Sequence, residues 1–140
     1  MVSYFTEDCS FDFKGKKRIT SRWLKETAIN EGRVLGQINV IFCSDPYLLE
    51  VNRKYLNHNF YTDIITFDYC EGNVLSGDLF ISIDCVKVNS EDFGTTFENE
   101  LNRVIVHGLL HLIGYDDHCD EDIAMMRKKE NQYLLTREKL

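Results

Sequence analysis

The sequence predicts an α+β protein, a mixed α/β sandwich in which one small mixed sheet is flanked by about five helices. Two observations favour this class. Short runs rich in β-branched residues lie mostly in the first two-thirds of the chain, and longer amphipathic segments flank them. The 140 residues also contain no repeat, low-complexity tract or linker-like stretch, so residues 1–140 are expected to form a single domain.

The first part of the chain predicts an extended segment, a helix, a strand and a second helix. Residues 2–13 alternate apolar and polar side chains, which is typical of extended backbone. Residues 19–30 carry apolar side chains on one helical face, and QINVIFCS at 37–44 has the β-branched composition of a strand. A capping serine and the only proline of the chain predict a helix over residues 46–56.

The second part predicts two further strands and three helices. The runs DIITFDY at 63–69 and GDLFISI at 77–83 are expected to be strands, with a turn at EGN, residues 71–73. Gly114 is expected to end the longest helix, because glycine readily adopts the left-handed conformation that closes a helix. The three expected helices cover residues 84–92, 97–113 and 120–137.

Composition and charge limit the class of protein. The net charge of −7 argues against a protein that coats nucleic acid by bulk attraction, although residues 14–25 form a local basic segment. The five cysteines are odd in number and widely spread, which predicts free thiols in a reducing compartment. No signal peptide or membrane-spanning run is recognisable, so a cytoplasmic protein without a membrane partner is expected.

Three of the four histidines lie within the stretch HGLLHLIGYDDH, residues 107–118. His107 and His111 are four residues apart on a predicted helix, so both imidazoles project from nearly the same face and can share one metal ion. After Gly114 the chain can fold back and bring Asp117 or His118 to the same ion. Three protein ligands with an open fourth position are typical of catalytic zinc. The alternative is a pair of core histidines that are only hydrogen-bonded.

The spacing HxxxHxxGxxD resembles the zinc signature of metzincin-type proteases, which implies a zincin-like metal site on a central helix. In those proteases the residue after the first histidine is glutamate, the general base for the attacking water. Here that residue is Gly108. The spacing therefore retains the metal site and disfavours peptide hydrolysis by that mechanism.

With glycine in that position, the stretch resembles the YbeY family of bacterial endoribonucleases and ribosomal RNA maturation factors, whose signature is H-G-x-L-H-L-x-G-Y-D-H. Two upstream segments are also similar to that family. They are LEVNRKYLNHNFYTDIITFDY at 49–69 and SGDLFIS at 76–82. The signature is matched by His107, Gly108, Leu110, His111, Leu112, Gly114, Tyr115 and Asp116.

The chain departs from the family pattern at the third metal ligand and at a catalytic arginine. The family's third histidine corresponds to Asp117, and His118 is displaced by one residue. Asp117 is favoured because it keeps the register, and the other residue is expected to support a ligand or to shuttle protons. The family arginine corresponds to Leu56. Arg53, about one helical turn earlier, is the candidate substitute, and a solvated surface arginine is the alternative.

The resemblance implies supporting roles for two aspartates. Asp63 is expected near the metal as an orienting group, although Thr62 and Asp63 also fit a simple turn before a strand. Asp78 is expected to hydrogen-bond a metal-binding imidazole. The expected catalytic residues are Arg53 and His111.

The resemblance further implies a single YbeY-like domain that is a zinc-dependent endoribonuclease specific for single strands, with one zinc ion or another divalent metal. Its expected roles are maturation of the 3′ end of small-subunit ribosomal RNA and ribosome quality control. Its expected partners are single-stranded or ribosomal RNA, the small ribosomal subunit and assembly factors. The basic residues expected to hold RNA are Lys16, Lys17, Arg18 and Arg22, and the alternative is a solvated helix face that balances the acidic surplus. The aromatic residues available for base stacking or core packing are Phe60, Tyr61 and Tyr115.

Two other functions are compatible with these residues. A ribosome-assembly factor with a structural metal and no catalysis would explain the altered third ligand and the missing arginine. A small metalloprotease would explain the histidine spacing, but Gly108 counts against it.

Overall fold

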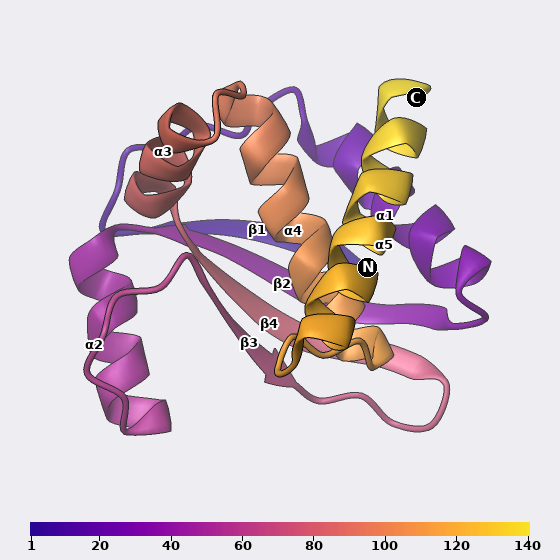
Figure 1. Ribbon diagram of the computed structural model, residues 1–140, viewed down its shortest axis with the longest axis horizontal. Helices are drawn as coiled ribbons and strands as arrows, with labels where there is room; N and C mark the ends of the chain where they lie inside the picture. Colours follow the sequence, from indigo (N-terminus) through magenta and orange to yellow (C-terminus); the bar gives the residue numbers. More distant parts are fainter.

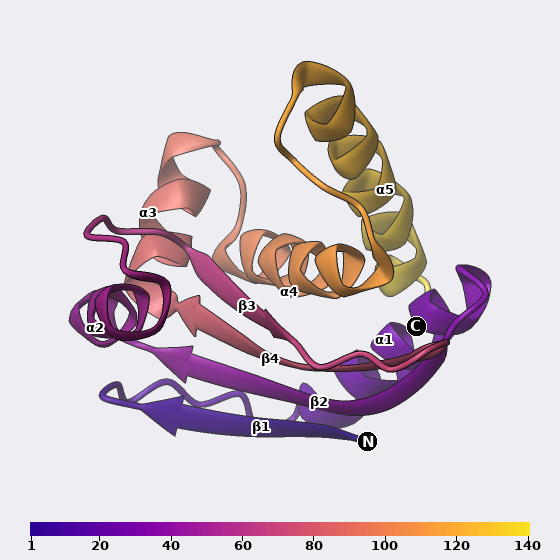
Figure 2. The same cartoon turned by 90° about the horizontal axis from the view of Figure 1, so that it is seen from below.

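The computed structural model describes residues 1–140 and contains one four-stranded mixed sheet. The strand order is β1-β2-β4-β3, with β1 parallel to β2, β2 parallel to β4, and β3 antiparallel to β4. The arrowhead of β3 accordingly points opposite to the others (Figure 2). The strands are β1 (Val2–Glu7), β2 (Val34–Cys43), β3 (Ile64–Asp68) and β4 (Val74–Ser82).

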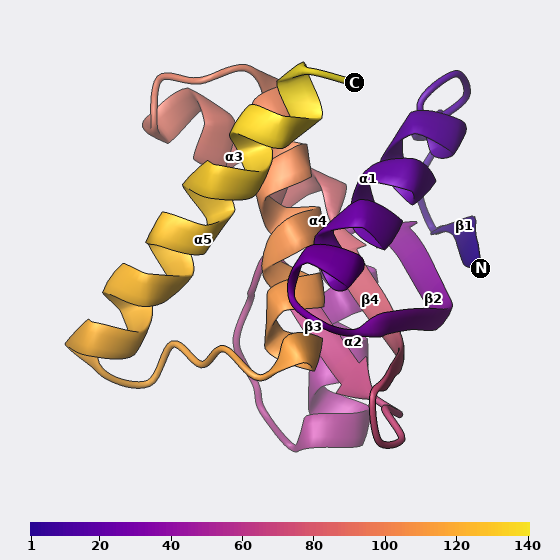
Figure 3. The ribbon, with the colours of Figure 1, turned by 90° about the vertical axis from the view of Figure 1, so that its right-hand side faces the viewer.

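Five helices accompany the sheet, which confirms the expected α+β class (Figure 1). Four of them contribute to the large core on one face of the sheet, and α4 lies in the middle, with α5 and α1 on either side of it (Figure 3). None of the helices is long and apolar enough to cross a membrane. The helices are α1 (Lys17–Asn30), α2 (Asp45–Leu56), α3 (Ile83–Asp92), α4 (Phe97–Ile113) and α5 (Asp120–Glu138).

Alternation along β4 sets the two faces of the sheet. Leu79 and Ile81 belong to the large core beneath α4, whereas Phe80 packs against the smaller cluster formed with α2. Because successive side chains of a strand point to opposite faces, α2 covers the face opposite to α4. A serine caps the start of α2 and of α3. Ser44 accepts a hydrogen bond from the Tyr47 N–H, and Ser82 accepts one from the Cys85 N–H.

Close approach of α4 to the sheet explains Gly108. A Cβ at this position would lie 2.8 Å from Ile64 Cδ1 and 2.9 Å from Leu79 Cδ2, inside van der Waals contact. The glycine therefore lets the histidine-bearing helix pack directly on β3 and β4. The position that carries the catalytic glutamate in metzincin-type proteases faces the core and has no room for a side chain.

The structure shifts three expected boundaries by three residues or more, one of which is the start of β2 at Val34 rather than at residue 37. The extended segment expected over residues 2–13 forms a strand only as far as Glu7, because Asp8 adopts a left-handed conformation with φ of 55° and turns the chain. Strand β4 begins at Val74 rather than at residue 77, because Val74 and Leu75 continue the parallel pairing with Val34 and Leu35. The start of β4 is thus determined by its pairing with β2, which is distant in sequence.

Candidate metal centre

Three side chains from α4 and the following loop converge on one point. His107 Nε2 lies 3.0 Å from His111 Nε2, and an Asp117 carboxylate oxygen lies 3.6 and 3.4 Å from these two nitrogens. Zinc bonds of roughly 2.0 Å in a tetrahedron require ligand atoms about 3.3 Å apart. The three atoms therefore have the spacing of three corners of a zinc tetrahedron, and imidazole and carboxylate are ligands that zinc accepts.

The loop that carries Asp117 is fixed at its start. Gly114 ends α4 with φ of 124°, and the N–H groups of Gly114 and Tyr115 both donate to the Leu110 carbonyl, at 3.1 and 3.0 Å. The Tyr115 hydroxyl then donates to Glu31, 2.6 Å away at the end of α1. Two anchors thus lie within three residues of Asp117, and they direct its carboxylate towards the histidines.

A buried carboxylate orients the first histidine. His107 Nδ1 lies 2.7 Å from Glu130 Oε2, and Glu130 on α5 is only 4% exposed. A carboxylate carries no proton, so Nδ1 donates this hydrogen bond and Nε2 keeps its lone pair for the cavity. Arg103 balances the buried charge, with its Nη1 donating to Glu130 Oε1 at 2.9 Å.

The two histidines differ in their affinity for a proton. Burial disfavours a charged His107, but the hydrogen bond and charge of Glu130 outweigh it and raise the pKa of His107. Burial, and then the neighbouring His107, lower the pKa of His111. For Glu130, burial opposes ionisation, but the hydrogen bonds from His107 and Arg103 leave its pKa lowered. In the metal-free pair, His107 is therefore protonated to the imidazolium form in preference to His111.

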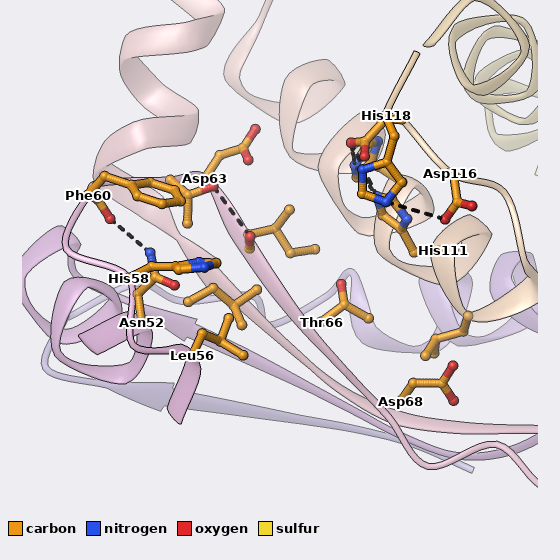
Figure 4. Close-up of a pocket in the computed structure, with 16 residues that line it drawn as sticks. Asn52, Leu56, His58, Phe60, Asp63, Thr66, Asp68, His111, Asp116 and His118 are labelled. Carbon is orange, nitrogen blue, oxygen red and sulfur yellow. Dashed lines mark hydrogen bonds and ion pairs between the residues drawn. The ribbon is translucent and has the colours of Figure 1, made fainter. Parts of the chain in front are cut away.

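The convergent atoms open onto a cavity of about 420 Å3, a size typical of ligand sites. Figure 4 shows His111 and His118 at one end and His58 and Phe60 at the other. Asp63 lines the same cavity, and burial raises the pKa of its carboxyl while the charge of His107 partly opposes the increase. The 16 lining residues include four aspartates, Asp63, Asp68, Asp116 and Asp117.

One family model matches nearly the whole chain. Residues 2–138 match the model of the family described as "Endoribonuclease YbeY". The chain belongs to the YbeY family. The resemblance seen in the histidine stretch therefore extends over nearly the whole sequence.

Several relatives and one solved structure agree with this assignment. "Endoribonuclease YbeY" of Bacteroides thetaiotaomicron is 53% identical over 122 residues, covering 87% of this chain and 89% of that protein. The protein of the same name from Phocaeicola vulgatus is 51% identical over 134 residues, covering 96% of both chains. The solution structure of TM1509 from Thermotoga maritima has a TM-score of 0.67 at 32% identity, covering 96% of this chain and 87% of that one.

The structure separates the two candidates for the third ligand. Asp117 lies beside both histidines, whereas the His118 side chain is 83% exposed and its Nε2 lies 4.0 Å from an Asp116 oxygen. His118 still lines the outer part of the cavity. Within this YbeY-family chain, the position that keeps the family register is thus the one beside the histidines.

Asp78 is not brought to the histidines, so its expected hydrogen bond to an imidazole is wrong. A Cβ on Gly77 would touch Leu112 of α4, so Asp78 points to the opposite face of the sheet. There its carboxylate accepts from Asn39 Nδ2 at 2.9 Å. The short sequence motif contained no information about which face the aspartate would occupy.

Arg53 is also held away from the cavity. Its Nη1 lies 2.6 Å from Glu50 and its Nε donates to Asn59 Oδ1 at 2.6 Å, and it does not line the cavity. Leu56, which replaces the family arginine, does line the cavity. Arg53 instead fastens the loop between α2 and β3 to the helix that precedes it.

The basic segment at the start of α1 lies at the far end of α4 from the histidines. Lys16 pairs with Glu98 at 2.8 Å, and Glu98 and His111 are separated by thirteen residues of helix, about 20 Å. Arg22 pairs with Glu26 at 3.1 Å on the exposed face of α1. None of the expected RNA-binding residues, Lys16, Lys17, Arg18 and Arg22, lines the cavity.

Glu130 was not among the expected site residues, although the sequence contained a signal for it. Met126, Tyr133 and Leu134 form the buried stripe of α5, and Glu130 falls on that stripe four residues after Met126. A carboxylate on an apolar helix face requires a buried partner. Here the partners are His107 and Arg103 on α4.

Proposed function

We propose that the protein is a zinc-dependent endoribonuclease that cleaves single-stranded RNA, with His107, His111 and Asp117 as the metal ligands. The observation that carries the proposal is the convergence of these three ligand atoms at the edge of a cavity. The relatives named as endoribonucleases support the RNA substrate. Another divalent metal would fit the same donors.

When bound, a zinc ion supplies a Lewis acid that lowers the pKa of water towards about 7 and stabilises negative charge on a phosphoryl oxygen. His107, His111 and Asp117 would hold the ion at the edge of the cavity. Glu130 fixes the His107 ring, with Nδ1 donating to the carboxylate and Nε2 facing the cavity. His111, which lines the cavity together with His107, is the histidine to which we assign catalytic contact.

Asp63 is the chain's own group for proton handling beside the ligands. It lines the cavity next to His107, and its backbone carbonyl accepts from the Ser82 N–H at 2.9 Å. This backbone bond fixes the start of β3 and hence the position of the carboxyl. Its raised pKa favours a carboxyl that can take up or release a proton nearer to neutral pH.

We further propose a single-domain protein of the cytoplasm that acts in ribosomal RNA processing, including maturation of the small-subunit 3′ end, and in ribosome quality control. The small subunit and its assembly factors are then the expected partners. Four aspartates but no lysine or arginine line the cavity, so the basic start of α1 would hold RNA only outside it. A protease function is disfavoured because the Cβ position of Gly108 faces the core.

The experiment compares His107→Ala with His118→Ala, a matched control because His118 is the exposed histidine of the same stretch. Zinc content is measured by metal analysis, and cleavage is followed on an end-labelled single-stranded RNA. His107→Ala is expected to lose both stoichiometric zinc and cleavage, and His118→Ala is expected to keep both. Cleavage that persists in metal-free His107→Ala protein would contradict the proposed mechanism. Zinc binding without RNA cleavage by the wild type would instead favour an assembly factor.

A further inference from the structure

We propose that His58 and Phe60 form a stacking subsite for one unpaired nucleobase of the RNA. This inference rests on the proposed function, because it assigns the base of the bound strand to the end of the cavity opposite the metal ligands. Both aromatic side chains line the cavity, and they belong to the loop between α2 and β3. Figure 4 shows them together at one end, with His111 at the other.

The geometry of the pair suits stacking on a base. The ring centroids of His58 and Phe60 lie 5.2 Å apart with an interplanar angle of 24°, so the two rings form a nearly parallel stack. Phe60 is 55% exposed, and neither ring belongs to the buried core. Exposed, stacked aromatic rings beside a nucleic-acid site bind bases of any sequence, because every base has a π-face.

Hydrogen bonds fix the backbone of the loop that carries these rings before RNA binds. Asn52, only 1% exposed, donates through Nδ2 to the Phe60 carbonyl at 2.9 Å, and its own carbonyl accepts from the His58 N–H at 3.1 Å. Asn57 turns the chain with φ of 54°, and Arg53 donates to Asn59 at 2.6 Å. A loop tied at these points loses little conformational freedom when a base stacks on it.

Charge decides which part of the nucleotide this end of the cavity accepts. Asp63, directly before β3, and Asp68, at its end, both line the cavity, and no lysine or arginine lines it. Without a cation, these carboxylates repel phosphate, so phosphate is favoured only beside a bound metal. A neutral base on His58 and Phe60 avoids this repulsion, and the Thr66 hydroxyl lines the wall within the same cavity.

The test uses zinc-loaded wild type, Phe60→Leu and the matched control Phe5→Leu. Leucine keeps an apolar side chain and removes the aromatic face, and Phe5 on β1 is 49% exposed but does not line the cavity. The probe is a single-stranded oligoribonucleotide, cleavage of which gives kcat and KM. A second set of oligoribonucleotides carries one abasic site or one 2-aminopurine at successive positions around the cleaved bond.

Phe60→Leu is expected to raise KM by about 5- to 150-fold, the range for one base–aromatic stack, with unchanged zinc content. Phe5→Leu is expected to match the wild type. An abasic site at one position should abolish the difference between Phe60→Leu and wild type. At that position 2-aminopurine fluorescence should be quenched by the wild type and by Phe5→Leu, but not by Phe60→Leu. A purely structural role of Phe60 would not be confined to one nucleotide position.

The possible results distinguish a failure of the base-stacking subsite from a failure of the proposed endoribonuclease function. Efficient RNA cleavage by Phe60→Leu with an unchanged KM would overturn the subsite and leave the endoribonuclease proposal intact. A KM effect of equal size on every abasic substrate would also overturn the subsite. Absence of RNA binding and cleavage by zinc-loaded wild type would overturn both proposals.

Discussion

Glu130 provides a sharp test of how the fold prepares the metal site. The change is Glu130→Gln, which keeps the shape of the side chain and removes its charge. Glu130 accepts a 2.7 Å hydrogen bond from His107 and a 2.9 Å hydrogen bond from Arg103, both inside the protein. A charge-assisted hydrogen bond is roughly twice as strong as a neutral one, so the His107 bond loses about 1 kcal/mol.

That loss corresponds to a decrease in zinc affinity of about five- to tenfold, because the weaker partner orients His107 less firmly and lowers its basicity. Glu130→Ala removes the partner entirely and is expected to approach a 100-fold decrease, the upper range for lost carboxylate partners of histidine ligands. The assay is a competition titration against a chromophoric zinc chelator. Urea unfolding of each metal-free variant separates lost zinc affinity from lost stability.

The matched control is Glu121→Gln, which removes a charge from the exposed first turn of the same helix. Its zinc affinity is expected to equal that of the wild type. If Glu130→Gln also bound zinc as tightly as the wild type, the orienting role of the carboxylate would be refuted. The affinity order wild type, Gln, Ala is the result that the hydrogen-bond geometry requires.

Three further results are expected. Gly108→Ala should destabilise the fold by about 1–3 kcal/mol in urea unfolding, because its Cβ would overlap Ile64, and an unchanged midpoint would contradict this packing. Because the pKa of His107 is raised, its ion pair with Glu130 stabilises the metal-free protein, and this stabilisation is complete below pH about 6.5, the pKa of a free histidine. This stabilisation is lost as pH rises through the raised pKa of His107, while zinc affinity increases because fewer protons compete for the ring. Variants without His107 should show neither the loss of stability in urea unfolding at different pH values nor the gain of affinity in zinc titrations. Asp117→Asn should lower zinc content far more than His118→Ala, and equal retention in the two variants would refute Asp117 as the preferred ligand.

Local regularity explains what the sequence predicts correctly. His107 and His111 are four residues apart on one helix, so helical geometry alone brings their rings together, at a centroid distance of 4.5 Å. Gly114 ends that helix as expected. The placement of Asp117 followed from the family register and not from periodicity, because helical geometry does not extend into the loop.

Tertiary packing explains what the sequence did not predict. Glu130 reaches His107 only because α5 packs on α4, and the two residues are 23 positions apart in the chain. Asp78 was assigned to the wrong face because a seven-residue motif fixes alternation along a strand but not which side receives the helix. Arg53 was expected to replace the family arginine from its helical spacing, yet Glu50 and Asn59 engage its guanidinium.

The most direct test of the metal centre is anomalous diffraction at the zinc absorption edge, from crystals grown with one equivalent of zinc. We expect one peak per chain, about 2.0–2.2 Å from His107 Nε2, His111 Nε2 and an Asp117 carboxylate oxygen, with the fourth position open to the cavity. A peak bound by His118 in place of Asp117 would contradict the assigned ligand set. The absence of any peak between the two imidazoles would contradict the metal centre itself.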